Sequence, residues 1–176
     1  NENLLRQKIY QLIAGYAEDD NADELTNDPV FTKVIDTDAL ASQPSLSRFY
    51  NRFDDESIKQ LNQANQKILD KVHSFRESKT IIFDLDSTHS DTYGDQELTA
   101  YNTHYGAVGF HPLVAFDGIT GDFLKAKLRP GNVYTSNGVV DFIKPLIEHY
   151  NEQFPETTPF LRGDSGFAVP ALYDLP

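Results

Sequence analysis

The first part of the chain carries apolar residues at the three- and four-residue spacing of helices. One stripe begins at Leu5, and a second runs from Ile58 to Phe75. Both predict helices with one apolar side. Asp28 followed by Pro29 predicts that a short helix starts here, between the two stripes, because Asp is a good N-cap and Pro is favoured in the first turn of a helix. The residues of the two stripes are Leu5, Ile9, Leu12, Ile13 and Tyr16, and then Ile58, Leu61, Ala64, Ile68, Val72 and Phe75.

A further short helix is predicted after Ser45, which is a suitable N-cap. Its apolar side holds Leu46, Phe49, Tyr50 and Phe53, and its polar side holds Ser47, Arg48, Asn51 and Arg52. This arrangement is typical of the second helix of a helix-turn-helix, whose polar side contacts DNA. A short packing helix with a solvated polar side is the alternative, and it is the favoured interpretation because small helix pairs are common and this helix has only two arginines.

The pattern changes after Ser78. Apolar, β-branched runs predict strands, and a helical stripe separates the third strand from the fourth. The expected order is strands at 80–86, 105–116 and 122–128, a helix from Thr135 or Ser136 to Tyr150, and a strand at 159–163. Three antiparallel strands, a right-handed crossover helix and a fourth strand parallel to the first open a ribonuclease-H-like fold. We therefore predict an all-α segment over 1–78 and a partial ribonuclease-H-like α/β core over 79–176.

Composition narrows the possible functions. The 176 residues are 39% hydrophobic, with no cysteine and a formal charge of −12. These values exclude a disordered chain and a disulfide scaffold, and no apolar run is long enough for a transmembrane helix. Such a charge argues against an extended basic DNA-binding surface. Either the chain is an acidic domain that avoids polyanions, or its acidic groups gather at a metal site and the basic DNA-holding parts lie elsewhere in the parent protein. The absence of an initiator Met before Asn1 suggests a fragment of a longer protein.

Two aspartates are the best candidates for catalysis. Asp86 closes the first strand and Asp164 follows the fourth, and the predicted order makes these strands neighbours. Two close carboxylates repel each other unless a cation lies between them, and Mg²⁺ prefers such oxygen ligands. Asp84 shares a strand face with Asp86 because strand side chains alternate. It is a supporting or alternative ligand.

The motifs around these aspartates resemble those of a known family. Phe83-Asp-Leu-Asp-Ser-Thr88 and Phe160-Leu-Arg-Gly-Asp-Ser-Gly-Phe167 are similar to the first two catalytic motifs of DDE transposases. The ordered series between them resembles bacterial insertion-sequence transposases of the group called "thirteen-eighty". That series is Gly94-Asp-Gln96, Tyr101-Asn-Thr-His-Tyr105, Gly109-Phe-His-Pro-Leu113, Thr120-Gly121 and Leu128-Arg-Pro-Gly131, and Ser42-Gln-Pro-Ser-Leu-Ser-Arg48 of the helical part also fits.

This resemblance implies a function and its cofactors. Asp86 and Asp164 would be the first two catalytic carboxylates and would hold Mg²⁺ or Mn²⁺, and the third, a Glu, would lie beyond position 176. The protein would hydrolyse phosphodiesters and transfer strands at the ends of an insertion sequence. Its partners would be double-stranded DNA, at the element ends and the target, and further copies of itself. Its place would be the bacterial cytoplasm, at the nucleoid, without a membrane partner.

Other interpretations and weaker candidates remain open. Arg162 can pair with the carboxylates, hold a phosphate or form a structural ion pair, and Thr88 can bond the strand end or touch DNA. A non-catalytic nucleic-acid or protein interaction module derived from a transposase is the alternative to an enzyme. Another ribonuclease-H-like nuclease is a third interpretation. The fragment alone, without the Glu, is expected to be inactive.

Overall fold

The computed structural model describes residues 2–175 and divides the chain into two compact units. Asn1–Leu61 forms the first unit and Asn62–Pro176 the second. The sequence prediction placed the boundary at Ser78, whereas the division falls inside the long helix α5 (Asp55–Arg76). The difference arises because most of α5 belongs with the α/β unit. Among the residues that the structure describes, no helix is both long and apolar enough to span a bilayer.

The first unit is helical, as predicted. It contains α1 (Glu2–Ile13), α2 (Asn21–Glu24), α3 (Pro29–Ile35) and α4 (Gln43–Tyr50), followed by the start of α5. Asp28 caps α3 as expected, since its carboxylate accepts hydrogen bonds from two backbone N–H groups of the first turn. One expectation was wrong, because α4 begins after Ser42 instead of Ser45, with Pro44 in its first turn.

The apolar stripe of α1 is not its buried side. Gln7 and Gln11 are buried, whereas Ile9, Leu12 and Ile13 are exposed. The Gln7 amide explains its burial, because it donates to the carbonyl of Ala41 and accepts from the N–H of the same residue, each at 2.9 Å. Polar pairing with a neighbouring loop thus accounts for the burial of Gln7, whereas the Gln11 amide is buried without a hydrogen-bond partner among the described residues.

The stripe of α5 is also largely exposed. Ile68 is 63% exposed and Phe75 77%, and the buried residues of this helix are Leu69 and His73. The periodicity correctly predicted a helix but not the side that the rest of the chain covers.

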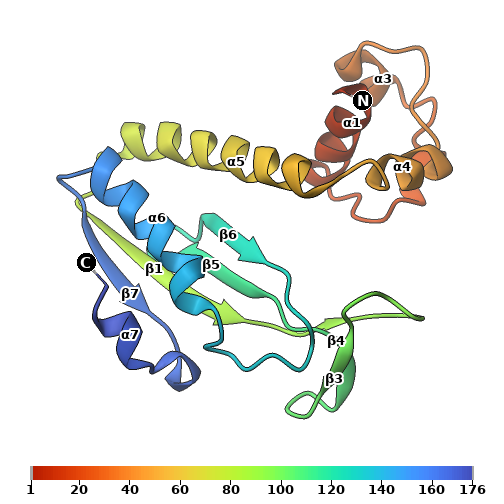
Figure 1. Ribbon diagram of the computed structural model, residues 1–176. Helices are drawn as coiled ribbons and strands as arrows, with labels where there is room; N and C mark the ends of the chain where they lie inside the picture. The colour runs from red at the N-terminus through yellow and green to blue at the C-terminus, as the bar shows by residue number, and fades with distance from the viewer. Residues whose placement is uncertain (1, 176) are drawn as a thin grey trace. The chain divides into compact units, whose positions relative to one another are not determined.

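The second unit is built on a four-stranded sheet with the predicted topology (Figure 1). The strands β1 (Thr80–Ser87), β5 (Leu113–Asp117), β6 (Phe123–Lys127) and β7 (Thr158–Arg162) lie in the order β6-β5-β1-β7. The pairs β1–β5 and β5–β6 are antiparallel, and β1–β7 is parallel. The helix α6 (Val139–Gln153) makes the crossover to β7. This is the strand order predicted for the start of a ribonuclease-H-like core.

One face of this sheet carries the core. Ile81, Phe83 and Leu85 alternate along β1 and are buried in one cluster with Phe142 and Ile143 of α6. Figure 1 shows α6 lying across this face of the sheet. The helix begins after Gly138, whose φ of +72° suits glycine, and not at Thr135 or Ser136 as the sequence suggested.

The predicted second strand is divided in two. Strand β4 (Ala107–Phe110) pairs with β2 (Ser90–Asp91) and β3 (Ala100–Asn102) in a separate small sheet, while β5 begins at Leu113. Pro112 lies at the break and has no N–H to donate to a ladder. After β7 follow a 3₁₀ turn (Ser165–Phe167) and the short helix α7 (Pro170–Tyr173).

Candidate active site

The parallel pair β1–β7 brings the two predicted catalytic aspartates to equivalent positions. Asp84 of β1 is in register with Arg162 of β7. Asp86 and Asp164 each lie two residues further along the chain. Adjacent strands are about 4.8 Å apart, and both aspartates line one cavity of about 520 Å³. The structure therefore places both side chains at one site, as the strand order suggested.

One oxygen of each of these carboxylates accepts a hydrogen bond from the backbone. Asp86 Oδ1 accepts a hydrogen bond from the N–H of Ser87 at 2.7 Å, and Asp164 Oδ1 accepts one from the N–H of Gly166 at 2.8 Å. Within residues 2–175 their Oδ2 atoms make no hydrogen bond, and both side chains are exposed. Two fixed, exposed carboxylates with a spare oxygen each are a donor set that suits Mg²⁺ or Mn²⁺.

Buried polar residues build the opposite wall of the cavity. Asn102 donates to the carbonyl of Gly131 at 2.7 Å, and its Oδ1 accepts from the N–H of His104 at 2.9 Å. His111 Nδ1 lies 2.8 Å from the carbonyl oxygen of Val133. A Cβ on Gly131 would lie 2.3 Å from the carbonyl oxygen of Ala100, so only glycine permits this close approach. The small sheet and segment 131–135 are thereby fixed to each other.

The buried side chain of Arg129 stabilises this wall through hydrogen bonds to backbone carbonyls. It is 5% exposed, and its Nε donates to the carbonyl of His111 at 2.9 Å. Its Nη1 donates to the carbonyls of Thr135 and Asn137, each at 2.9 Å, while Nη2 has no partner in the described part of the chain. Burial lowers the pKa of Arg129, but a guanidinium remains charged at neutral pH. The sequence showed this residue only as part of a family-like motif, and nothing in the pattern indicated its burial.

The other candidate residues near the strand ends do not line this cavity. Asp84 receives two hydrogen bonds from Arg162, at 2.8 Å from Nε and 2.5 Å from Nη2. This pairing lowers the pKa of Asp84. The structure thus shows Arg162 in an ion pair with Asp84 rather than beside Asp86. Thr88 is exposed, and its N–H donates to the carbonyl of Pro112 at 3.2 Å.

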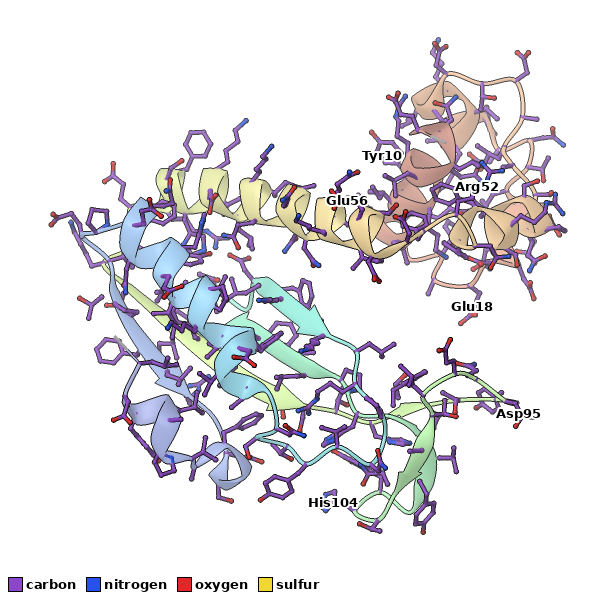
Figure 2. All side chains as sticks on the ribbon, in the orientation of Figure 1. Tyr10, Glu18, Arg52, Glu56, Asp95 and His104 are labelled. Carbon is purple, nitrogen blue, oxygen red and sulfur yellow. The ribbon has the colours of Figure 1, made fainter. Side chains whose placement is uncertain are left out.

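The residues considered for DNA contact lie together on α4 and just after it. Ser47, Arg48, Asn51 and Arg52 are all exposed, and Arg52 is labelled in Figure 2. A guanidinium nitrogen of Arg48 lies 3.4 Å from the hydroxyl of Ser45. Their contact with DNA stays a prediction.

A second group of possible metal ligands was not predicted from the sequence. The ligand atoms of His73, Asp117 and Asp122 all lie within 4.8 Å of one another. Asp117 accepts hydrogen bonds from a backbone N–H of the β5–β6 turn and from the hydroxyl of Thr120, each at 2.9 Å, and Asp122 pairs with Arg76. Because hydrogen bonds and an ion pair within the chain already engage these carboxylates, we interpret the group as a structural cluster that stabilises the β5–β6 turn.

This structural cluster predicts that the stability of the fold depends on pH. Burial lowers the pKa of His73, and the charges of Asp117 and Asp122 oppose that shift without cancelling it. The unfolded chain therefore takes up a proton at this histidine more readily than the folded chain does. Below about pH 6.5 this difference favours unfolding. We expect the free energy of unfolding, measured with urea, to fall between pH 7 and pH 5.

The matched variants are His73→Gln and His104→Gln. The first should flatten the decline in the free energy of unfolding, and the second, at an exposed histidine, should leave its slope unchanged. An unchanged slope in His73→Gln would contradict the assignment.

Comparison with known proteins gives the family. The sequence profile described as Transposase DDE domain group 1 matches residues 1–175. The chain belongs to this family. This membership confirms the resemblance to DDE transposases seen in the motifs. Such transposases are enzymes that cut and join DNA, and they generally use divalent metal ions. No curated protein matches this transposase domain.

Several solved structures are similar over most of the transposase domain. The Mos1 transposase paired-end complex with left transposon end has 13% sequence identity, and the TM-score is 0.34 over 90% of the chain. The mariner Mos1 paired end complex with Mg has 12% identity and a TM-score of 0.31 over 90% of the chain. The chain spans about half the length of these transposases, 55% in both cases. The family assignment rests on the sequence match alone.

Proposed function

We propose that this transposase domain supplies the first two carboxylates of a metal-dependent DNA transposase. The observation that carries the proposal is the meeting of Asp86 and Asp164 at one cavity. The protein would hydrolyse phosphodiesters at the ends of an insertion sequence and transfer the freed strands to target DNA. A non-catalytic nucleic-acid or protein interaction module is the alternative.

The donor set supports Mg²⁺ or Mn²⁺ as the cofactor. When bound, the ion would act as a Lewis acid that stabilises charge on the scissile phosphate and favours deprotonation of the attacking hydroxyl. The task of the chain is to hold Asp86 and Asp164 in place. The N–H groups of Ser87 and Gly166 do this by fixing one oxygen of each carboxylate. A third carboxylate would come from a Glu beyond position 176.

The partners follow from this chemistry. The substrate would be double-stranded DNA, and synapsis of two element ends would require self-association of the transposase. The exposed side of α4, with Arg48 and Arg52, would contribute contacts to DNA. Access to the bacterial chromosome would place the protein in the cytoplasm, at the nucleoid.

Strand cleavage by a longer chain that includes the third carboxylate tests the proposal. We expect nicking of a labelled duplex that carries an element end, with Mg²⁺ or Mn²⁺ and not with EDTA. The 176-residue chain should bind the duplex without nicking it. DNA binding by the longer chain without cleavage under any divalent ion would overturn the catalytic proposal and favour the interaction module.

A further inference from the structure

The cavity with the two aspartates contains a histidine that the proposed metal chemistry does not use. His111 lies just before β5 and is only 5% exposed, yet it lines the cavity. Its backbone is fixed on both sides, because its N–H donates to the carbonyl of Arg129 at 3.0 Å and its own carbonyl accepts from the Arg129 side chain at 2.9 Å. The imidazole ring is therefore presented to the cavity by a well-held backbone.

One hydrogen bond determines which ring nitrogen of His111 carries the proton. Nδ1 lies 2.8 Å from the carbonyl oxygen of Val133. A carbonyl oxygen only accepts hydrogen bonds, so Nδ1 must donate, and in the neutral ring Nε2 then carries the lone pair. The ring also meets that of Tyr105 edge-on, at 5.9 Å between centroids. These two contacts fix both the tautomer and the orientation of the imidazole.

The Nε2 atom of His111 is open to the cavity. It has no hydrogen-bond partner within residues 2–175, and it does not belong to the polar atoms that are cut off from solvent. The two other histidines that contact Tyr105 differ from it. Both ring nitrogens of His89 are cut off from solvent, and no hydrogen bond in the described part of the chain orients the exposed ring of His104. Of these three rings, that of His111 presents an oriented acceptor.

The position of this nitrogen does not suit a third ligand on a shared ion. Within the described residues, the ligand atoms of His111, Asp86 and Asp164 do not all lie within 4.8 Å of one another. The cavity of about 520 Å³ leaves room for a group of the substrate between the carboxylates and Nε2. We therefore ask which group of the substrate would donate a hydrogen bond there.

The attacking group of the proposed reaction is such a donor. It is a hydroxyl, either of water or of the freed 3′ end of a DNA strand, and a hydroxyl both accepts and donates. Its oxygen turns lone pairs toward the cation and the phosphorus, while its hydrogen needs an acceptor. The spare oxygens of Asp86 and Asp164 would be engaged by the cation, whereas Nε2 of His111 would stay available. The volume of the cavity is many times that of one water molecule, which suits the end of a strand.

We propose that Nε2 of His111 accepts a hydrogen bond from the terminal 3′-hydroxyl of the DNA strand and so orients this hydroxyl beside Asp86 and Asp164. This inference rests on the proposed function and adds to it a residue that touches the substrate. It explains why a buried histidine is anchored through Nδ1 while its Nε2 faces the cavity without a partner in residues 2–175.

DNA ends that differ in one hydroxyl test this inference. The probes are two fluorescein-labelled duplexes in Mg²⁺, identical except that the element-end strand terminates in a 3′-hydroxyl or in a dideoxy sugar, and binding is measured by anisotropy. The variant is His111→Asn, because the asparagine amide can still donate to the carbonyl of Val133 but has no counterpart of Nε2. His104→Asn is the matched control at a second histidine of the cavity.

The wild-type chain is expected to bind the 3′-hydroxyl duplex about 2- to 12-fold more tightly than the dideoxy duplex, which is the range for one neutral hydrogen bond. His111→Asn should bring this ratio close to one, and His104→Asn should retain it. Nuclear magnetic resonance of the wild-type chain with isotope-labelled histidine does not depend on how well the variants fold. The Nε2 resonance of His111 should shift with the 3′-hydroxyl duplex and stay nearly unchanged with the dideoxy duplex.

Three results would overturn the inference. Equal binding of the two duplexes by the wild-type chain, with an unchanged Nε2 resonance, would refute the contact and leave DNA binding in place. Discrimination that persists in His111→Asn would show that another group recognises the hydroxyl. If the wild-type chain binds neither duplex, the proposed function fails, and the inference fails with it.

Discussion

Replacing either Asp86 or Asp164 with asparagine is expected to reduce strand cleavage by the longer transposase about 10³-fold or more. Asparagine keeps the shape of the side chain and removes the negative charge that holds the cation. Because both side chains are exposed and line one cavity, the fold should be unaffected. The assay is nicking of a labelled element-end duplex, and thermal unfolding verifies that each variant is folded.

Asp84→Asn is the matched control for this prediction. Asp84 lies on the same strand as Asp86, but it pairs with Arg162 and does not line the cavity. This variant should retain cleavage within a few-fold of the wild type. If Asp164→Asn retained full activity while Asp84→Asn lost it, the metal ligands would be assigned to the wrong carboxylates.

Replacing Arg129 with methionine is expected to lower the free energy of unfolding by about 3 kcal/mol. Methionine fills a similar volume, but the carbonyls of His111, Thr135 and Asn137 lose a charged donor inside the protein. Removing the buried cation also removes its desolvation cost, and this gain offsets part of the lost hydrogen-bond energy. Urea unfolding measures the effect.

Two further variants isolate the cause. Arg129→Lys keeps the charge but not the planar fork, so it should lie between the wild type and Arg129→Met. Lys127→Met removes an exposed cation from the neighbouring strand and should change the free energy of unfolding by less than about 0.5 kcal/mol. Equal stability of Arg129→Met and Lys127→Met would show that the buried guanidinium does not hold the cavity wall.

The sheet and its two aspartates could be predicted because simple rules govern them. The run from Thr80 to Asp86 is apolar and β-branched, and a crossover helix requires the fourth strand to lie parallel to the first. Once β1 and β7 are known to be neighbours, the positions of Asp86 and Asp164 at one end of the sheet follow from counting residues along the two strands. No contact beyond the main-chain ladder is needed for this inference.

The small sheet could not be predicted in the same way. Its strands β2 and β3 have two and three residues, too few for a periodic pattern. Its position depends on close approaches at Gly109 and Gly131, where a Cβ would meet backbone carbonyl oxygens. The sequence shows that these residues are glycines but not which backbone passes them.

Burial was the other quantity that the pattern did not determine. Gln7 is buried because the backbone of Ala41 satisfies its amide, and Arg129 is buried because carbonyl groups surround it. Phe75 is apolar yet exposed. Gln7 and Ala41 are far apart along the chain, and the carbonyls around Arg129 belong to irregular segments, so local periodicity carries no information about either contact. The cavity wall was missed for this reason.

The most direct test of the metal site is anomalous diffraction from Mn²⁺-soaked crystals of this chain. We predict one strong peak between the carboxylates of Asp86 and Asp164, lost in Asp164→Asn. A peak confined to His73, Asp117 and Asp122, with none at Asp86, would contradict the assignment of the metal site.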